Sequence, residues 1–292
     1  MDPIADLFVP AVLALLMLVV GSDLAVVDFR RVADDPRTAL WGTLAALLLP
    51  SFAAAGLVLA VRPAPSVAAG LILLAACPSG ALSNYYVFLA RADLALSVTL
   101  TACSIVASLV TLPLVATLSL SLLLAERAPI AVPAGRLLGP MALFVLLPVA
   151  TGMVVRARRP ELVRRLAAPL RRVSVAAILA LIAAVTLDRG LSFHGASLQL
   201  GLLVLALTIA SLAIGLAVGR LARAGAAARL TLAFELGTRN VAVAVLLGVT
   251  ALGGSEFLVF GAVALLAQAP VLLVTAGICR RVLRSAPAGM HR

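Results

Sequence analysis

The sequence predicts an all-α membrane protein, with one polytopic domain over residues 1–292. Three observations lead to this class. First, 63% of the residues are apolar and the mean hydropathy is +1.19, well above the values of soluble domains. Second, apolar runs of membrane-crossing length follow one another with little chain between them. Third, polar residues interrupt two of these runs, which sets them apart from the others.

Nine helical spans are predicted, because about 20 mostly apolar residues are needed to cross the hydrocarbon core. The first run is expected to be a span and not a signal peptide, since its leader MDPIAD is acidic and the run is long. The predicted spans are residues 7–27, 38–60, 67–90, 93–124, 134–157, 170–188, 197–221, 226–250 and 255–283.

The basic residues predict how these spans are oriented. The net charge is +11, and the sequence has 23 basic residues, all of them arginine. Most lie in alternate loops, at 30–37, 91, 156–172, 220–229 and 280–292. The positive-inside rule then predicts an external N-terminus and a cytoplasmic C-terminus in the inner (plasma) membrane. We find no basic helix face with interleaved aromatic residues, so nucleic acid is not an expected partner.

The eighth span, 226–250, contains an acidic and a basic residue where a lipid-spanning helix should be apolar. A charge at bilayer depth costs roughly 3 kcal/mol on insertion scales. Glu235 and Arg239 lie four residues apart, and Gly237, Thr238 and Asn240 accompany them. This composition predicts an unwound segment around a binding site.

The third span, 67–90, carries a comparable interruption. Pro78 removes a helix donor, and Gly80 follows it. Five spans separate corresponding positions, which predicts an inverted five-helix repeat whose first helix is missing. Paired interruptions at matching repeat positions indicate a transport site near the midplane. The alternative is that Pro78 and Gly80 only kink a packed helix.

Four segments resemble the bile acid:sodium symporter family. They are LALLMLVVGSDLAVVDFRRVADDPR, CPSGALSNYYVFLARADLALSVTLTACS, LLPVATGMVVRARRP and FELGTRNVAVAV. The resemblance implies a panel domain, about 7–27 and 134–157, and a core domain, about 38–124 and 170–283. It also implies that the two broken helices cross in the core and hold sodium beside an organic anion.

The first sodium site that the resemblance implies is complete in this chain. Its positions are Ser83, Asn84, Ser97, Thr101 and Glu235. Carboxylate, amide and hydroxyl oxygens suit a hard cation, and Ser97 and Thr101 share a helix face because they are four apart. On spacing alone, these two hydroxyls would instead be expected to bond to carbonyls of their own helix.

The second implied sodium site departs from the family pattern. Its positions are Ala45, Leu236, Thr238 and Arg239. Ala45 has no side-chain oxygen, and Arg239 has only donors and stays charged. We therefore hypothesise that Arg239 is a built-in cation, so that coupling falls to one sodium ion or none. Two alternatives stay open: Arg239 pairs with Glu235 or Asp23 for structure alone, or it binds a substrate carboxylate.

These features predict a secondary transporter of a small organic anion that works by alternating access, and the family resemblance implies a bile-acid-like compound or another carboxylate as the substrate. Asn84, Arg239 and Asn240 are the candidate substrate-binding residues, and sodium is the candidate coupling ion. No enzymatic activity is expected, since Ser83 has no nearby base. Asp23 is interpreted as an interfacial charge.

Two other functions are considered. A metalloid (arsenite-type) efflux permease of the same fold would rely on a membrane cysteine, for which Cys77 is available. A non-transporting membrane scaffold is the other. Cys77, Cys103 and Cys279 are otherwise expected to be small buried side chains without a metal or a disulfide. The substrate, the direction of transport and the oligomeric state are left open by the sequence.

Overall fold

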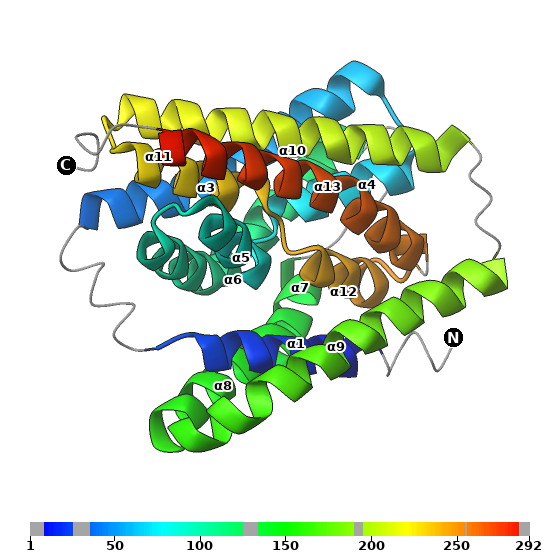
Figure 1. The fold of residues 1–292 in the computed structure, drawn as a ribbon. Coiled ribbons are helices and arrows are strands. Elements are labelled where there is room, and N and C mark those ends of the chain that lie inside the picture. The colour runs from blue at the N-terminus through cyan, green and yellow to red at the C-terminus, as the bar shows by residue number, and fades with distance from the viewer. Residues whose placement is uncertain (1–8, 26–35, 125–133, 190–194, 255, 286–292) are drawn as a thin grey trace.

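The computed structural model describes residues 9–25, 36–124, 134–189, 195–254 and 256–285 (Figure 1). Within these ranges every regular element is helical, which confirms the all-α class. The elements in chain order are α1 (Val9–Asp23), α3 (Pro36–Val61), α4 (Pro65–Ala76), α5 (Ala81–Ala90), α6 (Leu94–Leu124), α7 (Ala134–Met141), the π-helical η2 (Ala142–Leu146), α8 (Leu147–Arg158), α9 (Pro160–Arg189), α10 (Gly195–Leu221), α11 (Ala226–Gly237), α12 (Val241–Ala251) and α13 (Glu256–Ser285).

Six segments of the described chain are long and apolar enough to cross a bilayer. They are Pro36–Val61, Leu94–Leu124, Gly135–Arg158, Leu198–Leu221, Ala226–Ala251 and Glu256–Arg281. Two more apolar helices, Pro10–Asp23 and Pro65–Ala76, are shorter. The predicted span 170–188 lies within α9, which is not one of the six. Several membrane crossings are thus supported, and the count of nine stays a prediction.

The structure corrects the expectation that the arginines of 156–172 lie in a loop. Helix α8 continues to Arg158, and α9 already begins at Pro160. Proline suits a first helical position, where no N–H is needed, and the intervening Arg159 has a non-helical backbone (φ −138, ψ 62) that separates the two helices. The arginines at 30, 31, 127 and 292 lie outside the described residues, so the orientation stays a prediction.

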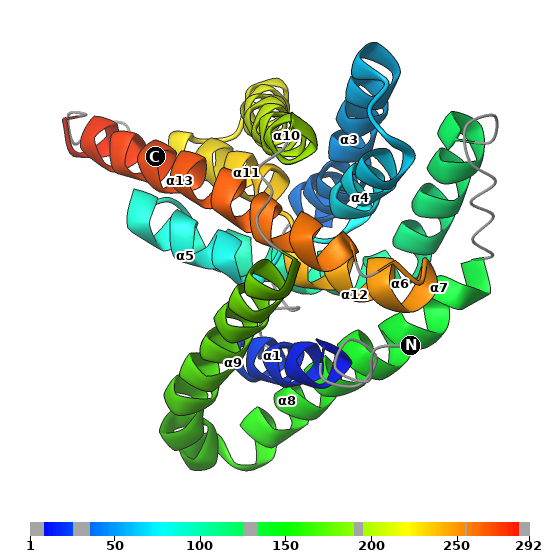
Figure 2. The ribbon, with the colours of Figure 1, turned by 90° about the vertical axis from the view of Figure 1, so that its right-hand side faces the viewer.

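Helices α1 and α8 pack closely because each has a glycine at the contact. A Cβ added to Gly21 would lie 2.1 Å from the Val149 carbonyl oxygen, and one added to Gly152 would lie 2.3 Å from the Leu18 carbonyl oxygen. Small residues permit such backbone approach between membrane helices. Helix α9 lies against both (Figure 2). The division into panel and core domains stays a prediction, with α1 and α8 on the proposed panel side.

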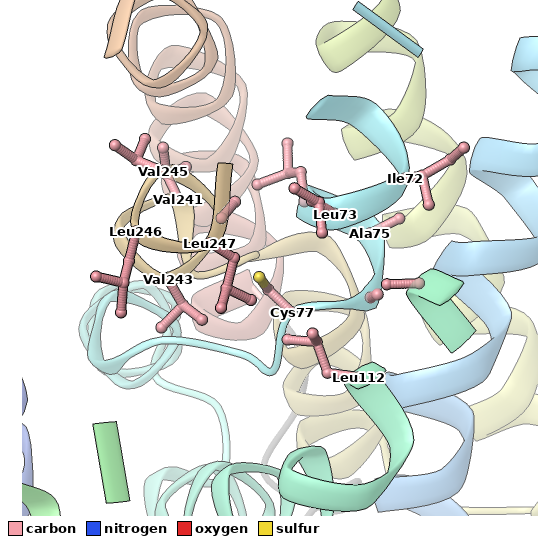
Figure 3. Packing of buried hydrophobic residues seen from close by; sticks show 14 of the residues in the cluster. Ile72, Leu73, Ala75, Cys77, Leu112, Val241, Val243, Val245, Leu246 and Leu247 are labelled. Carbon is pink, nitrogen blue, oxygen red and sulfur yellow. The ribbon is translucent and has the colours of Figure 1, made fainter. Parts of the chain in front are cut away.

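An apolar cluster surrounds the interruption between α4 and α5. Figure 3 shows Cys77 among Leu73 of α4, Leu112 of α6 and Leu247 of α12. All four side chains are essentially inaccessible. In a bilayer such contacts act through tight packing, because lipid tails are as apolar as leucine. The cluster therefore holds the two interrupted helix pairs together around the polar site described next.

Candidate functional site

Two helix pairs of similar dimensions supply the site. Helices α4 and α11 each have 12 residues, and the helices that follow them, α5 and α12, have 10 and 11. Cys77 is extended (φ −63, ψ 148) because the following Pro78 disfavours helical backbone there. Thr238, just after α11, is also extended (φ −97, ψ 114). Both predicted interruptions are confirmed, whereas the inverted repeat stays a prediction.

The two interruptions contact each other. The Asn240 N–H donates to the Pro78 carbonyl at 3.0 Å. A Cβ added to Gly80, the N-cap of α5, would lie 3.6 Å from Asn240. The Asn240 side chain caps α12, since its Oδ1 accepts from the Val243 N–H at 3.3 Å. The N-termini of α5 and α12 therefore meet at the crossing.

The Glu235 carboxylate is fully buried on α11 and is surrounded by hydroxyl groups. Ser97 Oγ donates to Glu235 Oε1 at 2.5 Å, and Ser79 Oγ donates to Oε2 at 2.6 Å. Thr101 Oγ1 lies 3.3 Å from Oε1 and 3.2 Å from Oε2. Helix α6 and the first interruption thus supply hydrogen bonds to a residue more than 130 positions further along the chain.

The other two predicted residues join the same cluster. Asn84 Oδ1 lies 2.7 Å from Ser97 Oγ and 3.4 Å from Thr101 Oγ1. Ser83 Oγ lies 3.2 Å from Thr101 Oγ1. Each hydroxyl has a single proton, yet the Ser97 and Thr101 hydroxyls each face both Asn84 Oδ1 and an oxygen of Glu235. Oxygen acceptors therefore outnumber the protons that could satisfy them.

The sequence reasoning missed Ser79 and Ser104. Ser79 contacts Glu235 directly, and Ser104 Oγ lies 3.1 Å from Ser79 Oγ. A signal for Ser104 was present in the sequence, since residues 97, 101, 104 and 108 recur at helical spacing on α6 and are all hydroxylic. Ser97 and Thr101, for which bonding to helix carbonyls was the alternative, reach across to Glu235. Ser104 and Ser108 do bond to carbonyls of their own helix.

Changing Ser79→Ala should destabilise the protein, because a buried carboxylate oxygen would lose its shortest donor. The expected loss is about 1–3 kcal/mol of unfolding free energy. It would be measured as a lower thermal unfolding midpoint in detergent. Ser108→Ala is the matched control, since within the described ranges the Ser108 hydroxyl bonds to the Ile105 carbonyl of its own helix and to nothing else. Equal midpoints for the two variants would contradict the assignment.

Arg239 donates to three backbone carbonyls. The residue is 4% exposed. Its Nη1 donates to the Ala46 carbonyl at 2.6 Å and to the Cys77 carbonyl at 3.1 Å. Its Nη2 donates to the carbonyl of Glu235. One guanidinium group thereby joins α3, the first interruption and the last turn of α11.

Each of these carbonyls lacks the helical donor that would normally serve it. The donor to the Ala46 carbonyl would be the N–H of residue 50, which is Pro50 and has none. Cys77 follows the last residue of α4, and Glu235 lies in the last turn of α11. Carbonyls at helix C-termini are unpaired and carry partial negative charge. The arrangement is therefore a cation site built from backbone oxygens.

Within the described part of the chain, no ion pair joins the side chains of Arg239 and Glu235. The guanidinium bonds to the Glu235 carbonyl instead of its carboxylate. Asp23 ends α1, and its own carbonyl accepts from Arg156 of α8. Arg239 is thus hydrogen-bonded to backbone carbonyls and, in the ranges that the structure describes, not to the side chain of Glu235 or Asp23 as the structural alternative would have it.

The other substituted positions flank these contacts. Ala45 is half-buried and precedes Ala46, while Leu236 and Thr238 are buried on either side of Gly237. Thr238 Oγ1 has no hydrogen-bond partner among the described residues. None of the three offers a second charge beside the guanidinium.

Comparison with known proteins identifies the group to which the chain belongs. The sequence model of the Sodium Bile acid symporter family matches residues 10–195. The chain belongs to this family. The resemblance inferred from the motifs is thereby confirmed. The family match includes the first interruption and the α6 hydroxyls, whereas Glu235 and Arg239 lie beyond it.

Three known proteins are similar in sequence to this chain over most of its length. A probable chloroplastic sodium/metabolite cotransporter, BASS2, of Oryza sativa subsp. japonica is 30% identical over 83% of this chain and 56% of its own length. An uncharacterized sodium-dependent transporter, YocS, of Bacillus subtilis (strain 168) is 28% identical over 80% of this chain and 71% of its own. A probable chloroplastic sodium/metabolite cotransporter, BASS1, of Arabidopsis thaliana is 29% identical over 92% of this chain and 66% of its own. The chain thus spans little more than half of the rice relative.

In this member of the symporter family, Cys77 contributes its backbone to the site and not its thiol. The side chain is fully buried in the apolar cluster, and the carbonyl accepts from Arg239. A thiol enclosed by leucines gives no specific support to metalloid efflux.

Proposed function

We propose that this protein is a secondary transporter of a small organic anion, coupled to a single sodium ion and working by alternating access. It would lie in the plasma (inner) membrane, with the N-terminus outside and the C-terminus in the cytoplasm. The observation that carries the proposal is the buried Glu235 carboxylate, which lies at the crossing of two interrupted helices among surplus oxygen acceptors.

Sodium is the proposed ligand of the Glu235 cluster. A buried anion without a counter-charge in direct contact is costly. Hydroxyl, amide and carboxylate oxygens from α5, α6 and α11 converge there, and hard cations favour such oxygens. The proposed sodium ligands are Ser83, Asn84, Ser97, Thr101 and Glu235, with Ser79 positioning the carboxylate.

Arg239 is the proposed replacement for a second sodium ion. Its guanidinium donates hydrogen bonds to the carbonyl oxygens of Ala46, Cys77 and Glu235. Such backbone oxygens are the ligands that unwound transporter helices offer to sodium. A side-chain charge cannot be released on either side of the membrane. Coupling would therefore involve one sodium ion, and the crossing would stay neutralised in every state of the cycle.

An organic anion suits the helix N-termini at the crossing. The N-termini of α5 and α12 meet there, and helix N-termini attract negative charge. Asn240 Oδ1 caps α12, while its Nδ2 has, among the described residues, one contact, at 4.0 Å to Met17 Sδ. Asn240 Nδ2, Asn84 and Arg239 are the proposed groups that face a substrate carboxylate.

Uptake into proteoliposomes tests the proposal. Small organic acids would first be screened by thermal shift, with sodium or choline as the only cation. The best binder would then be supplied in radiolabelled form to vesicles in sodium or choline buffer. We expect uptake that needs an inward sodium gradient, with a Hill coefficient for sodium of about one. Sodium-independent counterflow would refute the coupling, and binding without any counterflow would favour a scaffold.

A further inference from the structure

The corner between α8 and α9 concentrates exposed arginines at the end of a candidate membrane span. The span Gly135–Arg158 ends at this corner. Arg158, Arg159 and Arg165 are all exposed there. Residues that follow directly after a span lie at the level of the lipid headgroups. These guanidinium groups are therefore placed where lipid phosphates lie.

Three arginines line one cavity, and within the described part of the chain none of them forms an ion pair. A cavity of about 460 Å³ is lined by Arg158, Arg159, Arg165 and Glu161, together with Pro160 and Leu162. Glu161 forms an ion pair with Arg164. Among the described residues, the side chains of Arg158, Arg159 and Arg165 have no hydrogen bond or ion pair. Like charges held together in this way favour binding of an anion.

The first half of α9 has a second feature that suits a lipid surface. Leu162, Leu166 and Val173 recur on one side of the helix and are 45%, 43% and 55% exposed. Arg165 and Arg172 are seven apart, directly beside these apolar residues, and are also exposed. A helix with exposed apolar residues beside arginines is typical of segments that lie in the membrane interface.

We propose that the α8–α9 corner is a binding site for the phosphate of an anionic phospholipid. Arg158, Arg159 and Arg165 would hold the phosphate, since guanidinium groups match its geometry, and Leu162 and Leu166 would contact the acyl chains. The corner also touches the end of α1, because Arg156 donates to the Ser22 carbonyl at 3.3 Å. A bound lipid would thus hold α1, α8 and α9 together.

The neighbouring apolar residues favour a lipid over a soluble phosphate or a nucleic acid. A soluble anion would need only the arginines, whereas exposed leucines beside them are stabilised by acyl chains. Among the described residues, those that line the cavity at the corner include no aromatic side chain that could stack a base.

Lipid binding to the full-length protein tests the proposal. The detergent-purified chain would be titrated with dioleoyl phosphatidylglycerol or dioleoyl phosphatidylcholine, and retained lipid counted by native mass spectrometry. We expect selective retention of phosphatidylglycerol that weakens with salt. In the triple variant R158Q/R159Q/R165Q, its affinity should fall on the order of tenfold or more. The matched control R220Q/R223Q/R280Q removes the same charge from other exposed helix ends and should bind as the unchanged protein does.

Two further arms make the outcome decisive. The variant R158K/R159K/R165K keeps the charge without the guanidinium fork, and its affinity should lie between those of the other two proteins. Glycerol phosphate at the same concentration should not displace the lipid. Displacement of the lipid by glycerol phosphate would overturn the proposal in favour of a soluble anion. An equal loss of phosphatidylglycerol affinity in the control R220Q/R223Q/R280Q would also overturn it, because net charge alone would then explain the binding.

Discussion

Glu235→Gln is expected to abolish sodium-dependent uptake. The change keeps the shape of the side chain but removes the only charge in the hydroxyl cluster formed with Ser79, Ser97 and Thr101. Removing one partner of a buried charge pair costs about 3–5 kcal/mol, so the apparent sodium affinity should fall on the order of a hundredfold or more. Sodium titration of the thermal unfolding midpoint would measure this loss without needing the substrate.

Glu256→Gln is the matched control for this experiment. Glu256 is also a glutamate near a helix end, but it is exposed in the first turn of α13. Its sodium response should equal that of the unchanged protein. If Glu235→Gln keeps a normal sodium response while Glu256→Gln loses it, the proposed ion site is in the wrong place.

Replacing Arg239 by glutamine is expected to raise the sodium stoichiometry. The change frees the carbonyls of Ala46, Cys77 and Glu235, which lack helical donors. In the double variant Ala45→Gln, Arg239→Gln, new side-chain oxygens join these carbonyls, so a second sodium ion could bind. The Hill coefficient for sodium-dependent uptake should rise from about one towards two. In choline buffer the variant should be less stable than the unchanged protein, since each buried unsatisfied carbonyl costs about 1–3 kcal/mol.

Arg229→Gln controls for the loss of an arginine from the same helix. Arg229 is half-buried on α11, and its Nε donates to the Ala224 carbonyl at 2.6 Å, away from the crossing. This variant should keep a Hill coefficient of about one. A coefficient of about two in the unchanged protein would refute the idea that Arg239 replaces an ion.

The positions of the interruptions could be predicted before the structure was known, and so could four other members of the Glu235 cluster: Ser83, Asn84, Ser97 and Thr101. Pro78 and Gly237 act on their own helices, so the breaks follow from local chemistry. The cluster was inferred through the family resemblance, because no spacing rule links Glu235 to Ser97. Ser79 was missed for the same reason. A serine inside a break has no distinguishing pattern until its partner is known.

Helix α9 begins about ten residues earlier than the predicted span 170–188. The difference arises because a run of arginines is typical of a loop in a hydropathy pattern. Long side chains allow arginine to lie on a helix at the membrane interface with its charge in water. Hydropathy measures only the burial of a segment in lipid, so it does not distinguish an interfacial helix from a loop. The amphipathic spacing of Leu162 and Leu166 beside Arg165 was the relevant signal.

The sequence by itself determined the apolar segments, the two interruptions and the presence of one acidic and one basic residue in the second of them. These depend on composition and on residues near in the chain. Only the tertiary structure decided what Arg239 binds. Pro50 leaves the Ala46 carbonyl without a donor, but that carbonyl is 193 residues from Arg239. Backbone oxygens are the same at every residue, so no sequence pattern can name the one that a distant guanidinium will reach.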